Sequence, residues 1–252
     1  FNTESLTGTL LSETKTPNPS YLVISPDAKY VYAVSESGDN SSVSSFGFDK
    51  DKNNLHFINK VKVPADPCYI EIDHKQRFVV TADYSGGSVT FIPITADGSL
   101  MNAADIHSFS GHGVDSVRQT KPHLHCVTIS PDNKTAFATD LGTDRIYSIR
   151  LEPDKIDGDI SYLNHDSWSE TALEGRSGPR HFVFNKMGTR AYLLNEISGK
   201  VTVFSVDAEN RLEEIQSVVA DTCYAEGSAD IHLSPDNNFL YASTRLEGCR
   251  LS

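Results

Sequence analysis

Two histidines in the segment KPHLHCVTISPD (residues 121–132) are of a type and spacing that could do chemistry. His123 and His125 lie two residues apart, which places both side chains on one side of a β-strand. An imidazole accepts a proton near neutral pH because its ordinary pKa is about 6.5. A metal site is the other chemistry open to such a pair. No third histidine or carboxylate falls in the same strand, so we expect neither a metal nor an organic cofactor.

The elements that position these residues follow from internal repetition. Five segments share one pattern, and their starts lie 48 to 57 residues apart. They begin at Ser25, Asp73, Ser130, Asn185 and Ser234. Each follows a short β-rich stretch such as SYLVI or HCVTI, and a tight turn such as Pro-Asp joins the two stretches into a hairpin. Third strands (SVSSFGF, RIYSIRL) and weaker fourth strands (LHFINKVKV, LEEIQSVV) come next.

Four short strands per repeat, with almost no helix, predict an all-β fold, a β-propeller of four-stranded antiparallel blades. A two-sheet sandwich would not explain why one hairpin returns five times. We expect residues 1–252 to form a single propeller domain with about five blades, incomplete at both ends. The first residues match only the outer half of a blade, and the last second strand has no recognisable third strand after it.

Laying the repeats over one another gives two columns of residues. The residues five before each repeat start are Ser20, Cys68, His125, Arg180 and Ala229. The residues eleven after each start are Glu36, Tyr84, Leu141, Glu196 and Arg245. In an antiparallel hairpin the beginning of the first strand lies beside the end of the second. If the first strand is innermost, both columns surround one mouth of the central channel.

This mouth is the predicted site, because a base, two guanidiniums and a carboxylate converge on it. The catalytic candidates are His125, Arg180, Glu196 and Arg245, and the further substrate-binding candidates are His123, Glu36 and Lys121. Purely structural alternatives stay open, since His125 could hydrogen-bond a neighbouring blade, and Arg180 and Glu196 could form a simple ion pair. His181 has the opposite strand parity, and we expect it to pack between blades.

Composition limits the partners. A formal charge of -12 argues against nucleic acid, and no apolar run approaches the roughly 20 residues that span a bilayer. The four cysteines form no CxxC pair, and Cys68 and Cys126 read as reduced core thiols, which favours the cytoplasm and leaves a periplasmic location open. We expect a monomer or weak homo-oligomer, and a locally positive mouth on an acidic body if the ligand is an anion.

Several segments resemble one known family. TADYSGGSVTFIPITADGSL, KPHLHCVTISPD, ATDLGTDRIYSIRL and SGPRHFVFNKMGTRAYLLNE are similar to the seven-bladed propeller lactonases, over nearly the whole chain. That family includes propeller-type 6-phosphogluconolactonases and fungal 3-carboxy-cis,cis-muconate lactonizing enzymes. Its proposed active site is a His, an Arg, a Glu and a second Arg. These match His125 (with His123 as the alternative), Arg180, Glu196 and Arg245. The family usually has Asn before the last Arg, where this chain has Thr244, and it implies two further blades.

The resemblance implies hydrolysis of a small anionic lactone, most simply 6-phosphogluconolactone to 6-phosphogluconate in the pentose phosphate pathway. His125 would be the base, Glu196 would orient it or an arginine, and Arg180 and Arg245 would share the oxyanion and the anionic group. One alternative is a cycloisomerase that forms a lactone from a carboxylated muconate. The other is a non-catalytic propeller that binds a partner at its mouth, which would need neither His125 nor Glu196.

Overall fold

A computed structural model of the chain describes residues 2–103, 105–151, 163–222 and 226–245. These residues form four four-stranded antiparallel sheets and one two-stranded sheet. The first two sheets contain β1 (Leu22–Ile24), β2 (Tyr30–Ser35), β3 (Ser42–Asp49), β4 (Asn54–Lys62), β5 (Pro67–Ile72), β6 (Phe78–Asp83), β7 (Ser88–Pro93) and β8 (Asp105–Ser108). The other sheets contain β9 (Leu124–Ile129), β10 (Thr135–Asp140), β11 (Arg145–Leu151), β12 (Leu163–Ala172), β13 (Pro179–Phe184), β14 (Arg190–Asn195), β15 (Lys200–Val206), β16 (Leu212–Val219), β17 (Ser228–Leu233) and β18 (Leu240–Thr244).

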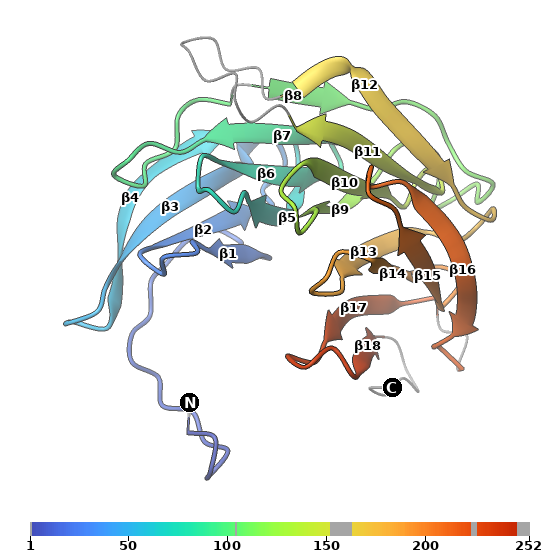
Figure 1. Cartoon of the computed structure of the whole chain (residues 1–252). Coiled ribbons are helices and arrows are strands. Elements are labelled where there is room, and N and C mark those ends of the chain that lie inside the picture. Colours follow the sequence, from blue (N-terminus) through green and yellow to red (C-terminus); the bar gives the residue numbers. More distant parts are fainter. Residues whose placement is uncertain (1, 104, 152–162, 223–225, 246–252) are drawn as a thin grey trace.

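The sheets stand as successive blades in an arc around a central space (Figure 1). The first strands β1, β5, β9, β13 and β17 are innermost, and each contacts the first strand of the next blade. The second strands β2, β6, β10, β14 and β18 lie in five separate sheets, at equivalent places in successive blades, as the repeats predict. The all-β blade architecture predicted from the sequence is therefore confirmed. Within the described residues the only helical element is a single 3-10 turn at Gly38–Asn40.

The hairpin turns show why the repeat is so regular. Ser25 donates its hydroxyl hydrogen to Asp27 Oδ1 at 2.8 Å and accepts the backbone N–H of Tyr30 at 2.9 Å. Ser130 and Ser234 make the same pair of contacts in their own blades. The fourth residue of every repeat has a positive φ, between 55° and 69°. The side-chain hydrogen bonds thus hold the left-handed turn that reverses the chain.

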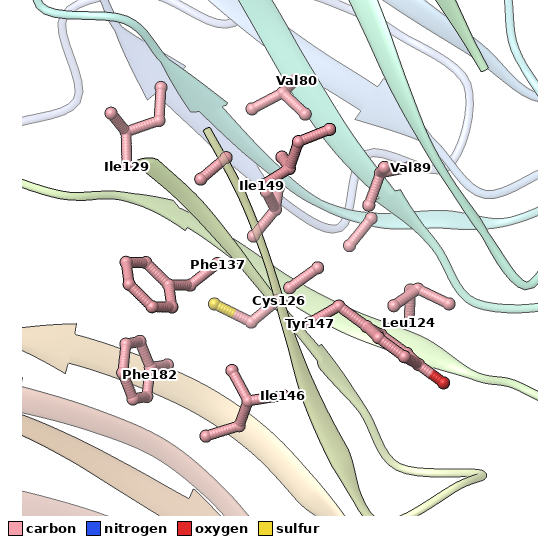
Figure 2. Close-up of a cluster of buried hydrophobic side chains, with 14 of the residues drawn as sticks. Val80, Val89, Leu124, Cys126, Ile129, Phe137, Ile146, Tyr147, Ile149 and Phe182 are labelled. Atoms are coloured by element: carbon pink, nitrogen blue, oxygen red, sulfur yellow. The ribbon is translucent and has the colours of Figure 1, made fainter. Parts of the chain in front are cut away.

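The core lies between neighbouring blades. Figure 2 shows Phe137 of β10 and Phe182 of β13 packed beside Cys126 of β9 and Ile146 of β11. Each of these four side chains is at most 1% exposed. Cys126 is a free, buried thiol, whereas Cys223 and Cys249 lie outside the described residues. No helix in the described part of the chain is long and apolar enough to cross a membrane.

A β-bulge interrupts the start of the inner strands. Pro67 pairs with Asp83 and Tyr69 with Ala82, so Cys68 is the extra residue in β5. In the same way, His125 is the extra residue in β9 and Arg180 is the extra residue in β13. Strand β17 also has a register shift, between Ser228 and Ile231. A bulge bends a strand and redirects the side chain of its extra residue. Three of the five positions in the column predicted five residues before each repeat start, Cys68, His125 and Arg180, are therefore bulge residues.

Candidate active site

A cavity of about 490 Å³ opens where the bulges meet. Eight of the ten residues in the two predicted columns line it, the exceptions being Ala229 and Leu141. The full wall is Ser20, Tyr21, Glu36, Cys68, Tyr84, Arg118, His125, Arg180, His181, Glu196 and Arg245. The structure thus brings His125, Arg180, Glu196, Arg245 and Glu36 together from four blades.

The other two substrate-binding candidates do not line this cavity. The Lys121 ammonium donates to the Ser85 carbonyl oxygen at 2.8 Å, which directs it to the exposed surface. The His123 ring stacks on Tyr84, with ring centroids 4.4 Å apart, and its Nδ1 lies 3.2 Å from the Tyr84 carbonyl oxygen. Local contacts in the approach to β9 therefore hold both side chains away from the wall.

His181 lies in the cavity wall, contrary to the expectation from strand parity. The bulge at Arg180 adds one residue to β13, so two consecutive side chains reach the channel side. His181 still contacts the next blade, because its Nδ1 lies 2.7 Å from Asp230 Oδ1 in β17. Burial lowers the pKa of His181, even though the Asp230 carboxylate acts in the opposite direction. The imidazole is therefore neutral, with Nδ1 donating to Asp230 and Nε2 accepting from Arg180 Nη1 at 3.3 Å.

Glu196 is the centre of the site. Its Oε1 accepts from Arg118 Nη2 at 2.6 Å. Its Oε2 accepts from Arg180 Nε at 2.7 Å and lies 3.1 Å from Arg245 Nη2. The carboxylate is only 4% exposed. Three guanidiniums from three different segments of the chain thus share one buried carboxylate, with geometry that suits charge-assisted hydrogen bonds.

Arg180 is the deepest of the three arginines, with 11% of its side chain exposed, against 38% for Arg118 and 51% for Arg245. It also donates from Nη1 to the Ala229 carbonyl oxygen in the next blade. Burial lowers the pKa of Arg180, while the charge of Glu196 raises it. Arginine keeps its proton in proteins, so this guanidinium is a fixed positive charge inside the cavity.

His125 is held between Cys68 and Glu196. Its Nδ1 lies 3.6 Å from Cys68 Sγ, and its Nε2 lies 3.8 Å from Glu196 Oε2, too far for a direct hydrogen bond. Burial holds the pKa of His125 well below its usual 6.5, and the charge of Arg180 lowers it further. Its imidazole is therefore neutral at pH 7, and Nε2 is the nitrogen directed toward the guanidinium cluster.

The segment DLGTDR (residues 140–145) ties two of the functional segments together. Asp140 accepts the backbone N–H of His123 at 2.7 Å, which fixes the entry to β9. Asp144 accepts the backbone N–H of Gly178 at 2.8 Å, just before β13. Gly178 has a φ of +63°, and a Cβ there would lie 2.6 Å from Ile197, so only glycine fits. The Gly178 carbonyl oxygen accepts the backbone N–H of Glu196 at 2.7 Å, which fixes the backbone position from which the Glu196 side chain extends.

Sequence reasoning missed Arg118. It lies in the connection from β8 to β9, residues 109–123, and has no counterpart in the other repeats. The other connections between blades that the structure describes throughout, residues 63–66 and 173–178, are shorter. The only signal was the repeat interval of 57 residues from Asp73 to Ser130, the longest in the chain. An insertion on the mouth face of a propeller is a natural place for a binding residue.

The wall of the cavity is positive although the chain is acidic. It carries three guanidiniums against Glu196 and Glu36, a formal charge of +1, while the whole chain carries -12. The described residues include no group of three or more His, Cys, Asp or Glu side chains placed to hold a metal ion. The positive charges and the neutral imidazole can bind an anion, accept a proton at His125 and stabilise an oxyanion.

Comparisons with known proteins point to one family. The model of the lactonase family, described as a seven-bladed β-propeller, matches residues 1–249. A 6-phosphogluconolactonase of Formosa agariphila is 33% identical over 251 residues, covering 97% of this chain and 70% of the relative. A solved structure of a suggested 6-phosphogluconolactonase from Bacteroides fragilis has a TM-score of 0.90 at 47% identity, covering 96% of this chain and 68% of that one. The structure of the periplasmic gluconolactonase of Pseudomonas aeruginosa has a TM-score of 0.83 at 30% identity, covering 93% of this chain and 67% of that one. The chain thus spans about two thirds of the length of these relatives.

Proposed function

The chain belongs to the seven-bladed β-propeller lactonase family, and we propose that it hydrolyses 6-phosphogluconolactone to 6-phosphogluconate. The observation that carries this proposal is the convergence of three guanidiniums on Glu196, beside the neutral imidazole of His125, in one cavity. Such a site suits an anionic substrate whose reaction needs a base and an oxyanion stabiliser. Relatives named for the same reaction support the assignment.

In the proposed reaction, water attacks the lactone carbonyl carbon while His125 Nε2 accepts one of its protons. The new C–O bond forms as the carbonyl π bond opens, and the carbonyl oxygen becomes an oxyanion. The intermediate then collapses, the bond from the acyl carbon to the ring oxygen breaks, and the ring oxygen takes back the proton from the imidazolium. The product is an open-chain acid that loses a proton to solvent.

Arg180 is the proposed oxyanion partner, because it is the deepest guanidinium and Glu196 together with Ala229 fixes its orientation. Fixed donors of this kind stabilise the transition state without reorganising during the reaction. Glu196 lies 3.8 Å from His125 Nε2, so its charge also stabilises the imidazolium that forms there. Arg245, the most exposed of the three, is the proposed contact for the anionic group of the substrate.

The partner in this proposal is a small anionic lactone, with no cofactor in the reaction. Since every proposed site residue comes from one chain, we expect a monomer or weak homo-oligomer to be active. We further propose a cytoplasmic location, because Cys68 and Cys126 are free thiols, as is usual in a reducing compartment.

Turnover of freshly prepared 6-phosphogluconolactone, measured as proton release above the spontaneous background, tests the proposal. We expect a rate well above the background that saturates with substrate. The same preparation should not convert a carboxylated muconate. Turnover of the muconate alone would replace the proposal with the cycloisomerase. Turnover of neither substrate would leave the mouth as a site of binding only.

A further inference from the structure

The connection that presents Arg118 is braced at several points. Asp115 Oδ1 accepts the backbone N–H groups of Val117 and Arg118 at 2.9 and 3.0 Å. Gln119 is fully buried, and its side-chain amide donates to the Leu141 carbonyl oxygen at 2.9 Å. Arg176 also lies 3.2 Å from Asp115 Oδ2. The loop thus holds its own shape and projects one side chain, that of Arg118, into the cavity.

The Arg118 guanidinium has donors left for a ligand. It donates to Glu196 Oε1 at 2.6 Å and lies close to the Tyr84 side chain in the cavity wall. These two contacts occupy only part of the five N–H donors of a guanidinium. The Arg118 side chain is 38% exposed and lines the cavity. It is therefore oriented by the protein and still accessible from the cavity.

The charges around Glu196 do not balance. One carboxylate neutralises one positive charge, yet three guanidiniums surround it, and two of them are far more exposed than Arg180. Extra positive charge concentrated in a cleft attracts an anion. If Arg180 meets the oxyanion at the bottom, Arg118 and Arg245 are left to contact the anionic group of the same substrate nearer the rim.

We propose that Arg118 is a specificity-determining residue that binds the phosphate of the substrate, so that the enzyme prefers a phosphorylated lactone to the same lactone without phosphate. This inference rests on the proposed function. Arg245, directly after β18, lines the same cavity and assists, but Arg118 is the arginine supplied by an insertion that the other described blade connections lack. Its planar guanidinium can form two parallel hydrogen bonds to one phosphate.

The test compares kcat/KM for 6-phosphogluconolactone and for glucono-1,5-lactone, both followed by proton release above background. We expect Arg118→Ala to lower the ratio of the two values by about 10- to 100-fold, mostly through KM for the phosphorylated lactone. Arg118→Lys should recover part of the ratio, since an ammonium restores the charge but not the two-pronged contact. Arg190→Ala is the matched control, because Arg190 is exposed and lies at the other end of β14 from Glu196.

Calorimetric titration with 6-phosphogluconate and with gluconate gives a second readout that needs no turnover. We expect the wild type to bind the phosphorylated acid more tightly, and Arg118→Ala to lose most of that difference. Equal losses on both lactones, or a wild type that does not distinguish the two acids, would overturn the role of Arg118. A wild type that hydrolyses neither lactone would overturn the proposed function instead, and the titration would still decide the role of Arg118.

Discussion

The two ends of each inner hairpin have opposite characters. At the turn end, three of the five repeats make the same Ser-Pro-Asp contacts, and all five have a residue with positive φ at the same position. At the mouth end, equivalent positions carry Cys68, His125 and Arg180 at the bulges, and nearly all the side chains differ in chemistry. The comparison shows that the same hairpin can be repeated for folding at its turn end, while the residues at its mouth end differ between blades and supply the functional groups.

The largest expected effect comes from removing the centre of the mouth. Glu196→Gln should lower kcat/KM by roughly 10³-fold, because three guanidiniums lose the carboxylate that orients them. It should also lower the free energy of unfolding by about 3 kcal/mol, since Arg180 is left as a buried charge. Kinetics and denaturant unfolding measure the two effects.

The control for this variant is Glu170→Gln at the half-exposed pair of Glu170 with Arg145. It should change the free energy of unfolding by less than about 1 kcal/mol and leave kcat/KM unchanged. Similar effects of the two substitutions would contradict the distinction between the mouth and the surface.

His125→Ala should have the next largest effect, lowering kcat by about 10²-fold with little change in KM. The pH dependence of the wild-type activity tests the direction in which the pKa of His125 is shifted. The pKa of His125 is held well below 6.5, so the base stays unprotonated as the pH falls through 6.5. We therefore expect the acid limb of kcat/KM, which reports the free enzyme, to appear only at a pH clearly below 6.5. A limb centred at or above 6.5 would show that another group is the base.

The smallest effect on activity is expected at the turn end. Ser130→Ala removes the hydroxyl that accepts the backbone N–H of Thr135 and donates to Asp132. It should lower the free energy of unfolding by about 1 kcal/mol and leave kcat/KM unchanged. A loss of activity in a variant of unchanged stability would mean that the turn end takes part in function.

The fold was predictable from the sequence because strand pattern and turn chemistry repeat together. In SPDNKTAFATDL and the equivalent segments of the other repeats, the turn residues and the strand pattern both specify the same hairpin. Much of the mouth could also be predicted, since antiparallel pairing forces Arg180 and Glu196 to adjoin. Strand register alone identifies these two positions as neighbours.

The remaining parts of the site depend on features that a repeat cannot encode. Arg118 comes from an insertion with no counterpart, so no column contained it. His181 reaches the cavity because of a bulge, and nothing in SGPRHF marks the extra residue that reverses the strand parity. Lys121 and His123 are turned away by contacts with Ser85 and Tyr84, in a loop whose path the sequence does not specify.

The rate of 6-phosphogluconolactone hydrolysis by Arg180→Ala, set against the wild type and the spontaneous background, tests the central claim most directly. That claim is that the mouth is a lactonase site in which Arg180 stabilises the oxyanion. We predict that the wild type exceeds the background strongly, that the variant loses roughly 10²- to 10³-fold in kcat/KM, and that Arg180→Lys recovers only part of the loss. A folded Arg180→Ala protein that hydrolyses the lactone as fast as the wild type would contradict the claim.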